Sequence, residues 1–151
     1  MVIVLDRITK LYIQNTFSPL DLVEVIPGFF NIVHVENPGA AFGMLATVPE
    51  QWRRPALVAF SAAVMGIIGV MLFRPRTRET VLTQTGLALV LGGAMGNLWD
   101  RAIRGTVTDF LQFFFGSYEY PSFNTADSAV CIGAGLLILD LLRSRRHSPG
   151  G

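Results

Sequence analysis

Two uninterrupted apolar stretches constrain this chain more than any other feature of its sequence. Residues 55–73 and 81–99 each run for 19 residues without a charged side chain. A helix of that length rises about 28 Å, close to the thickness of the hydrocarbon core of a bilayer. A third stretch, residues 122–142, is charged only at Asp127 and Asp140. The three stretches predict membrane-spanning helices.

The composition favours the same class of protein. Of the 151 residues, 51% are hydrophobic and 15% are charged, whereas soluble domains carry about 25% charged residues. A net charge of +1 excludes a nucleic-acid partner that is bound through bulk basicity. The single cysteine, Cys131, excludes an internal disulfide and a multi-cysteine metal site, and we expect it to pack inside a span.

Residues 1–15 predict a short first helix. The segment begins with five apolar residues, but Asp6, Arg7 and Lys10 follow at once. It lacks the basic start, continuous apolar core and small-residue cleavage site of a signal peptide. A span whose first half is missing, through truncation or a misassigned start at Met1, would explain the pattern.

Arginine placement predicts the topology. Segments 74–78 and 143–147 are short and rich in arginine, so the positive-inside rule makes both cytoplasmic. With four helices, both termini are then cytoplasmic and segments 16–54 and 99–121 lie outside. We expect one integral membrane domain over residues 1–151.

The two outer segments differ in character. Residues 22–26 and 29–35 are rich in β-branched and aromatic residues and are separated by a Pro-Gly pair, which predicts two or three short strands. Residues 99–121 carry a cluster of aromatic side chains that suits a membrane interface.

Small residues recur at intervals of four within the predicted spans. They are Ala62 and Gly66 in one span, and Ala88, Gly92 and Gly96 in the next. Because this spacing allows two helix backbones to approach closely, we predict helix packing at both places.

Two carboxylates, Asp109 and Asp127, stand at the outer ends of apolar segments. The loop of about 17 residues between them can bring them together. Two neighbouring carboxyls share a proton, so that one activates a water while the other donates to a carbonyl oxygen. In the alternative interpretation, each aspartate pairs with a nearby arginine, Arg101 or Arg104.

Other kinds of site have little support. His34 and His147 are the only histidines, so we expect neither a histidine-based triad nor a metal site. The sequence has no phosphate-binding loop or dinucleotide motif. We therefore predict no metal and no organic cofactor.

Four blocks of sequence, read together, resemble the lipoprotein signal peptidase (signal peptidase II) family. The blocks are DRITK at 6–10, ENPGAAFG at 36–43, GGAMGNLWDR at 92–101 with GTVTDF at 105–110, and FNTAD at 123–127. The resemblance implies an all-α membrane protein: a bundle of four transmembrane helices with a small periplasmic β-cradle and an amphipathic periplasmic segment. It also implies location in the bacterial cytoplasmic (inner) membrane.

The resemblance further implies an intramembrane aspartic endopeptidase that acts without a cofactor. Such an enzyme removes signal peptides from prolipoproteins by cleaving on the amino side of a diacylglyceryl-modified cysteine. Asp109 and Asp127 would be the catalytic pair. Supporting roles fall to Asp6, Lys10, Asn37, Gly39, Asn97, Arg101, Asn124 and Ala126. The expected partners are the prolipoprotein substrates and membrane lipid, with the enzyme as a monomer.

Two further expectations follow. The family usually has glutamine where Arg7 stands, and snorkelling of the arginine to the interface would accommodate this charge. Substrate would enter laterally from the bilayer, with acyl chains or signal-peptide residues in contact with Phe42, Met44, Phe113 and Phe114.

The alternative function is a small membrane transporter or channel subunit whose aspartates relay protons or bind cations. It predicts a polar stripe through the bilayer. The middles of residues 55–73 and 81–99 contain no ionisable group, which favours the peptidase.

Overall fold

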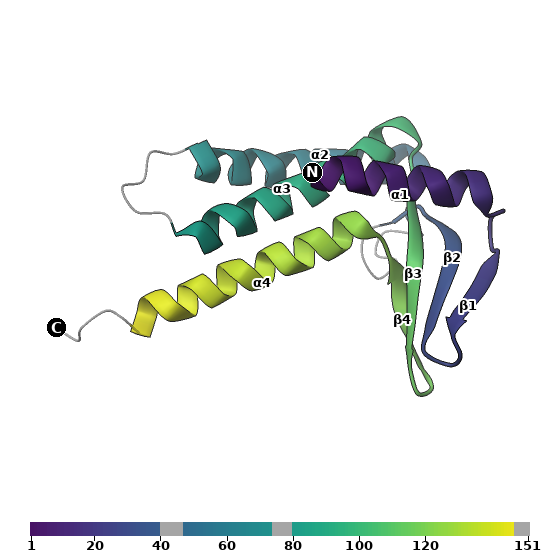
Figure 1. Cartoon of the computed structure of the whole chain (residues 1–151). Helices are drawn as coiled ribbons and strands as arrows, with labels where there is room; N and C mark the ends of the chain where they lie inside the picture. The colour runs from purple at the N-terminus through teal and green to yellow at the C-terminus, as the bar shows by residue number, and fades with distance from the viewer. Residues whose placement is uncertain (40–46, 74–79, 147–151) are drawn as a thin grey trace.

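Four helices and a four-stranded antiparallel sheet make up the computed structural model, which describes residues 1–39, 47–73 and 80–146. Figure 1 shows the sheet at one end of the helices, with its strands running across the helix direction. The elements in chain order are α1 (Val2–Thr16), β1 (Leu22–Ile26), β2 (Phe30–Asn37), α2 (Glu50–Phe73), α3 (Val81–Ile103), β3 (Val107–Phe115), β4 (Tyr118–Phe123) and α4 (Thr125–Arg146).

Three of the described helices are long and apolar enough to cross a membrane, over Glu50–Met71, Val81–Ile103 and Thr125–Arg143. They confirm the helices predicted at 55–73, 81–99 and 122–142, with different ends. Helices α2 and α3 continue into the charged segments that flank the apolar stretches. A charge-free window marks the part of a helix that lipid can surround, and the helix itself extends beyond that window.

Helix α1 buries two charged side chains and exposes most of its apolar ones. Asp6 and Lys10 are buried against the bundle, whereas Val4 and Ile8 are about 60% exposed. Such a pattern suits a helix whose outer face meets lipid. With 15 residues, α1 is about 22 Å long, and it is not among the helices long enough to span a bilayer. A fourth transmembrane helix therefore stays a prediction.

The sheet has the strand order β1-β2-β3-β4, and every neighbouring pair is antiparallel. Strands β1 and β2 confirm the strands predicted in the first outer segment. The aromatic segment at 99–121 contributes most of the β3–β4 hairpin, which turns at Gly116 with a φ of 65°. The all-α class is thus too narrow, because the chain is mostly helical with a small antiparallel sheet.

The described residues contain helices α1 to α4, and no separate helix corresponds to the amphipathic periplasmic segment that the resemblance implies. The expectation was based on family resemblance rather than on an apolar period in this sequence. The aromatic residues of segment 99–121 lie mostly on strands β3 and β4, and their place at a membrane interface stays a prediction. Residues 40–46, which include Phe42 and Met44, lie outside the described part, as does His147.

Glycines allow α3 to approach its neighbours closely. A Cβ atom at Gly92 would lie 2.9 Å from Cβ of Val2 on α1, and one at Gly96 would lie 2.5 Å from Oδ2 of Asp6. These contacts confirm the packing predicted at Gly92 and Gly96, whereas Ala88 is exposed, so the packing predicted there is wrong. A Cβ at Gly66 on α2 would meet nothing within 4 Å, so the packing predicted there is wrong among the described residues.

Cys131 lies on α4 within a candidate span but is exposed, so the prediction that it packs inside the span is wrong. The face of α4 that packs on α3 includes Ala126, Val130 and Gly133, which recur every three or four residues. Cys131 is out of phase with this series and so points away from α3.

Candidate active site

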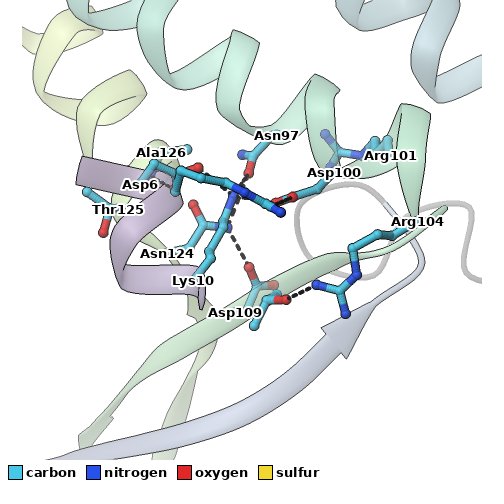
Figure 2. Close-up of polar contacts among 12 residues, drawn as sticks. Asp6, Lys10, Asn97, Asp100, Arg101, Arg104, Asp109, Asn124, Thr125 and Ala126 are labelled. Carbon is cyan, nitrogen blue, oxygen red and sulfur yellow. Dashed lines mark hydrogen bonds and ion pairs between the residues drawn. The ribbon is translucent and has the colours of Figure 1, made fainter. Parts of the chain in front are cut away.

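The two aspartates come from different elements and meet at Asn124. Asp109 lies in β3, and Asp127 lies in the first turn of α4. The β3–β4 hairpin, rather than a loop, returns the chain to the start of α4. The Asn124 side-chain amide donates to Oδ1 of Asp109 at 2.7 Å (Figure 2), and its backbone amide donates to Oδ2 of Asp127 at 3.2 Å.

Two more asparagines complete the hydrogen bonds to the carboxyls. Asn37 Nδ2 donates to Oδ2 of Asp109 at 2.9 Å, and Asn97 Nδ2 donates to Oδ1 of Asp127 at 2.7 Å. Each of the four carboxyl oxygens therefore accepts one hydrogen bond. Amides can hold a carboxyl in place without neutralising it, which leaves its proton available for chemistry.

The surroundings of the two carboxyls differ. Asp127 belongs to the first turn of α4, where the helix dipole stabilises a carboxylate. Asn124 caps this helix, because its Oδ1 accepts from the Asp127 backbone amide at 3.0 Å. Asp109 is only 3% exposed. Burial raises the pKa of Asp109 to about 7. The hydrogen bond from Asn37 lowers this pKa in part, and the charge of Asp127 raises it further.

Lys10 connects α1 to this site. Its ammonium is fully buried and lies 2.8 Å from Oδ2 of Asp6 and 2.8 Å from Oδ2 of Asp100. It also donates to Oδ1 of Asn97 at 2.9 Å (Figure 2). Because Lys10 holds the amide oxygen of Asn97, the amide nitrogen is left to face Asp127.

Asp6 and Ala126 join α1 to the start of α4. Oδ1 of Asp6 accepts from the backbone amide of Ala126 at 3.0 Å. Ala126 is fully buried, and Gly96 makes room for the Asp6 carboxylate. The supporting residues expected on these elements are therefore brought together around the aspartate pair.

Asp100 and Arg7 belong to the same cluster, although neither is among the site residues expected from the sequence. Arg7 Nη1 lies 3.1 Å from Oδ1 of Asp100. Arg7 forms an ion pair with this carboxylate, and its side chain is partly exposed. Together these two features account for an arginine at this position. Asp100 is three residues after Asn97, so helical spacing was the signal that could have identified it.

Arg101 lies beside the aspartates without pairing with them. Its Nη2 donates to the carbonyl of Gly39 at 3.3 Å, and Gly39 N donates to Oδ1 of Asn37 at 2.9 Å. Its positive charge interacts with Asp109 and Asp127 through space.

The arginine-pairing interpretation of the aspartates finds no support in residues 1–39, 47–73 and 80–146. Neither Asp109 nor Asp127 forms an ion pair there. Arg104, the other candidate partner, pairs instead with Glu36 at 2.9 Å.

His34 lies in β2, between the Phe17 carbonyl and Glu36. Within the described segments, histidine, cysteine and carboxylate side chains form no group of three that could hold a metal ion.

The fold resembles solved membrane enzymes. One structure, described as a bacterial membrane enzyme determined by the in meso method at 2.3 Å resolution, superposes with a TM-score of 0.86. It is 31% identical, and the match covers 99% of this chain and 88% of that one. A second, solved by the same method at 1.9 Å, has a TM-score of 0.79 at 33% identity and covers 93% and 87% of the two chains.

Sequence comparisons point to one family. The lipoprotein signal peptidase of Solibacter usitatus is 43% identical over 148 residues, covering 98% of this chain and 90% of the relative. That of Maridesulfovibrio salexigens is 43% identical over 143 residues, covering 95% and 91%. The family model described as signal peptidase (SPase) II matches residues 1–143. This chain therefore belongs to the signal peptidase II family.

Proposed function

We propose that this chain removes signal peptides from prolipoproteins, as an aspartic peptidase that uses Asp109 and Asp127. The observation that carries the proposal is the pair of carboxyls joined through Asn124 at the sheet end of the helices. Homologues named lipoprotein signal peptidase support the substrate class. The transporter alternative is not favoured, because these carboxyls gather at one end of α3 and α4 rather than along a membrane path.

The different surroundings of the carboxyls suggest their roles. Asp127, as the carboxylate, takes a proton from a water that attacks the scissile carbonyl carbon. Asp109, as the protonated partner, donates its proton to the carbonyl oxygen. When the tetrahedral intermediate collapses, the carbon–nitrogen bond breaks and the leaving amine receives the proton held by Asp127. A hydroxyl of the intermediate returns its proton to Asp109, which restores the starting state of both carboxyls.

The sheet provides an apolar surface beside Asp109. Side chains alternate along β3, so Asp109 and Phe113 share one face. On that face Phe113 stacks between Phe30 and Phe123, with ring centroids 4.7 Å and 5.8 Å away. Phe114 lies on the opposite face. We therefore assign contact with the lipid-modified part of the substrate to the Phe113 face alone.

Topology and oligomeric state remain part of the proposal. The apolar helices support a membrane protein. We place it in the inner membrane as a monomer, with both termini cytoplasmic and the aspartates near the outer face. Cleavage is assigned to the amino side of the diacylglyceryl-modified cysteine, and lateral entry from the bilayer suits a substrate that carries its own lipid.

The direct test is cleavage of a purified precursor by the purified chain in lipid. The precursor is prepared with its diacylglyceryl cysteine, and a matched precursor has that cysteine replaced by alanine. We expect a gel shift for the lipidated precursor only. Failure to cleave it, or equal cleavage of both precursors, would contradict the proposal.

The rate should fall as the pH rises above neutrality. With a pKa of about 7, Asp109 is mostly protonated below that pH and loses the proton it must donate above it. We expect kcat/KM to approach a tenfold decrease per pH unit on the alkaline side. A pH series in one lipid mixture measures this limb, and a profile that stays level well above neutrality would exclude Asp109 as the acid.

Chelators should not inhibit the enzyme. The proposed chemistry uses only the two carboxyls and water, so activity in EDTA should stay within about twofold of the untreated enzyme. The measurement is precursor cleavage before and after dialysis against EDTA. Inhibition that added zinc reverses would favour a metal-dependent mechanism.

A further inference from the structure

Glu36, at the end of β2, binds more partners than any role so far explains. Its carboxylate contacts four side chains: Arg104 Nη2 at 2.9 Å, Thr106 Oγ1 at 2.6 Å, Thr108 Oγ1 at 2.9 Å and His34 Nε2 at 3.2 Å. Three of these four come from the turn between α3 and β3 or from β3 itself. The contacts therefore join β2 to the segment that leads into Asp109.

The position of Glu36 along the strands connects it to the site. Glu36 and Thr108 are register partners between β2 and β3. Each directly precedes a residue of the site, since Asn37 follows Glu36 and Asp109 follows Thr108. Successive strand residues face opposite ways. The Glu36–Thr108 bond thus lies on one face of the sheet, and the Asn37–Asp109 bond lies on the other.

The register of β2 against β3 is irregular close to this point, with a shift between Ile32 and Val35. A shift of one residue would turn each side chain to the opposite face, which would remove Asp109 from its asparagine partners. The Glu36–Thr108 bond opposes such a shift. Thr108 is fully buried and also accepts from Gln14 Nε2 on α1 at 2.7 Å, which holds it from a second side.

Glu36 also binds both sides of the turn that starts β3. Arg104 is the C-cap of α3, Gly105 has a φ of +81°, and Thr106 follows. Arg104 and Thr106, one on each side of this glycine, both donate hydrogen bonds to Glu36. Burial raises the pKa of Glu36, but hydrogen bonds from the two threonines and His34, with the charge of Arg104, lower it overall. Glu36 therefore stays ionised and keeps all of its donors.

We propose that Glu36 is a positioning residue for the peptidase reaction: from the far face of the sheet it holds the α3–β3 turn and the β2–β3 register so that Asn37 and Asp109 stay in bonding geometry. The inference rests on the proposed function. Glu36 itself touches neither aspartate, and substrate is assigned to the opposite face.

Glu36→Leu tests this role through kinetics. We expect kcat to fall about 30-fold, because small displacements of a catalytic group reduce rates strongly, while KM changes by less than about twofold. The hydrogen bond from Asn37 lowers the pKa of Asp109. Its loss should therefore move the alkaline limb of the pH profile to higher pH. A residue needed only for stability would lower the melting temperature without moving that limb.

Glu119→Leu is the matched control. Glu119 also lies on the sheet, in β4, where it accepts one bond from Gln112 at 2.6 Å and is exposed. We expect its kcat and pH profile to match the wild type. If Glu36→Leu is not recovered as folded protein, Glu36→Gln is the second variant, because it keeps the shape of the side chain but loses its charge. Its kcat should fall less, by about fivefold, and the alkaline limb of its pH profile should also move to higher pH.

A Glu36 variant that folds, with wild-type kcat and an unmoved alkaline limb, would overturn the inference. Failure of the proposed function is a different result, since the wild type and Glu119→Leu would then also leave the lipidated precursor uncleaved.

Discussion

Asp109→Asn and Asp127→Asn are each expected to lower kcat for prolipoprotein cleavage by about a thousandfold or more. An asparagine keeps the size of the side chain but can neither accept the proton from water nor donate one to the carbonyl oxygen. Both carboxyls are held by asparagine amides rather than by cations, so the exchange removes no ion pair. The protein should therefore stay folded and inserted while activity is lost.

The measurement is the gel-shift assay with the lipidated precursor, supported by melting temperatures of the purified variants in one detergent. Glu119→Gln is a suitable control, because it makes the same chemical change on an exposed strand. Normal turnover by either aspartate variant would remove the pair from the mechanism.

Lys10→Met is expected to have the largest effect on stability. The Lys10 ammonium is fully buried between Asp6 and Asp100. Removing it leaves two carboxylates close together with Arg7 as the remaining cation of the cluster. Removing one partner of a buried ion pair lowers the free energy of unfolding by about 3–5 kcal/mol. We therefore expect a clear fall in the melting temperature.

The same variant should lose activity beyond its loss of stability, because the Asn97 amide is no longer held toward Asp127. Arg7→Gln is the matched comparison. Of the two carboxylates, Arg7 contacts only that of Asp100, and the Arg7 side chain is 38% exposed. Its removal should therefore lower the free energy of unfolding by about 1 kcal/mol or less. Equal melting temperatures for the two variants would show that Lys10 does not hold the cluster together.

Much of the site was predictable from local sequence. Asp109, Asp127 and their asparagine neighbours lie in short blocks that can be recognised one by one. Asp100 and Glu36 lie in the same blocks and were missed. Their roles depend on which face of a helix or strand meets another element, and for Glu36 that element is the turn of Arg104 and Thr106, about 70 residues away in sequence.

Helix ends were less predictable than helices. Helix α3 continues to Ile103, past the charged Asp100 and Arg101, because those side chains are neutralised or hydrogen-bonded inside the bundle. The hairpin of β3 and β4 was also missed, since a dense run of aromatic residues suits a strand as well as a membrane interface.

The sequence by itself determined which segments are long and apolar enough to span a membrane, because the transfer of a helix into hydrocarbon depends on the residues of that segment alone. It also predicted which acidic residues serve the proposed catalysis. Only the tertiary structure decided how those residues meet. Asn124 donates to both aspartates, Lys10 donates to Asn97, and Glu36 lies on the face of the sheet opposite to Asn37. Such contacts join residues far apart in the chain, and many pairings of the same polar side chains are compatible with the same pattern of apolar segments.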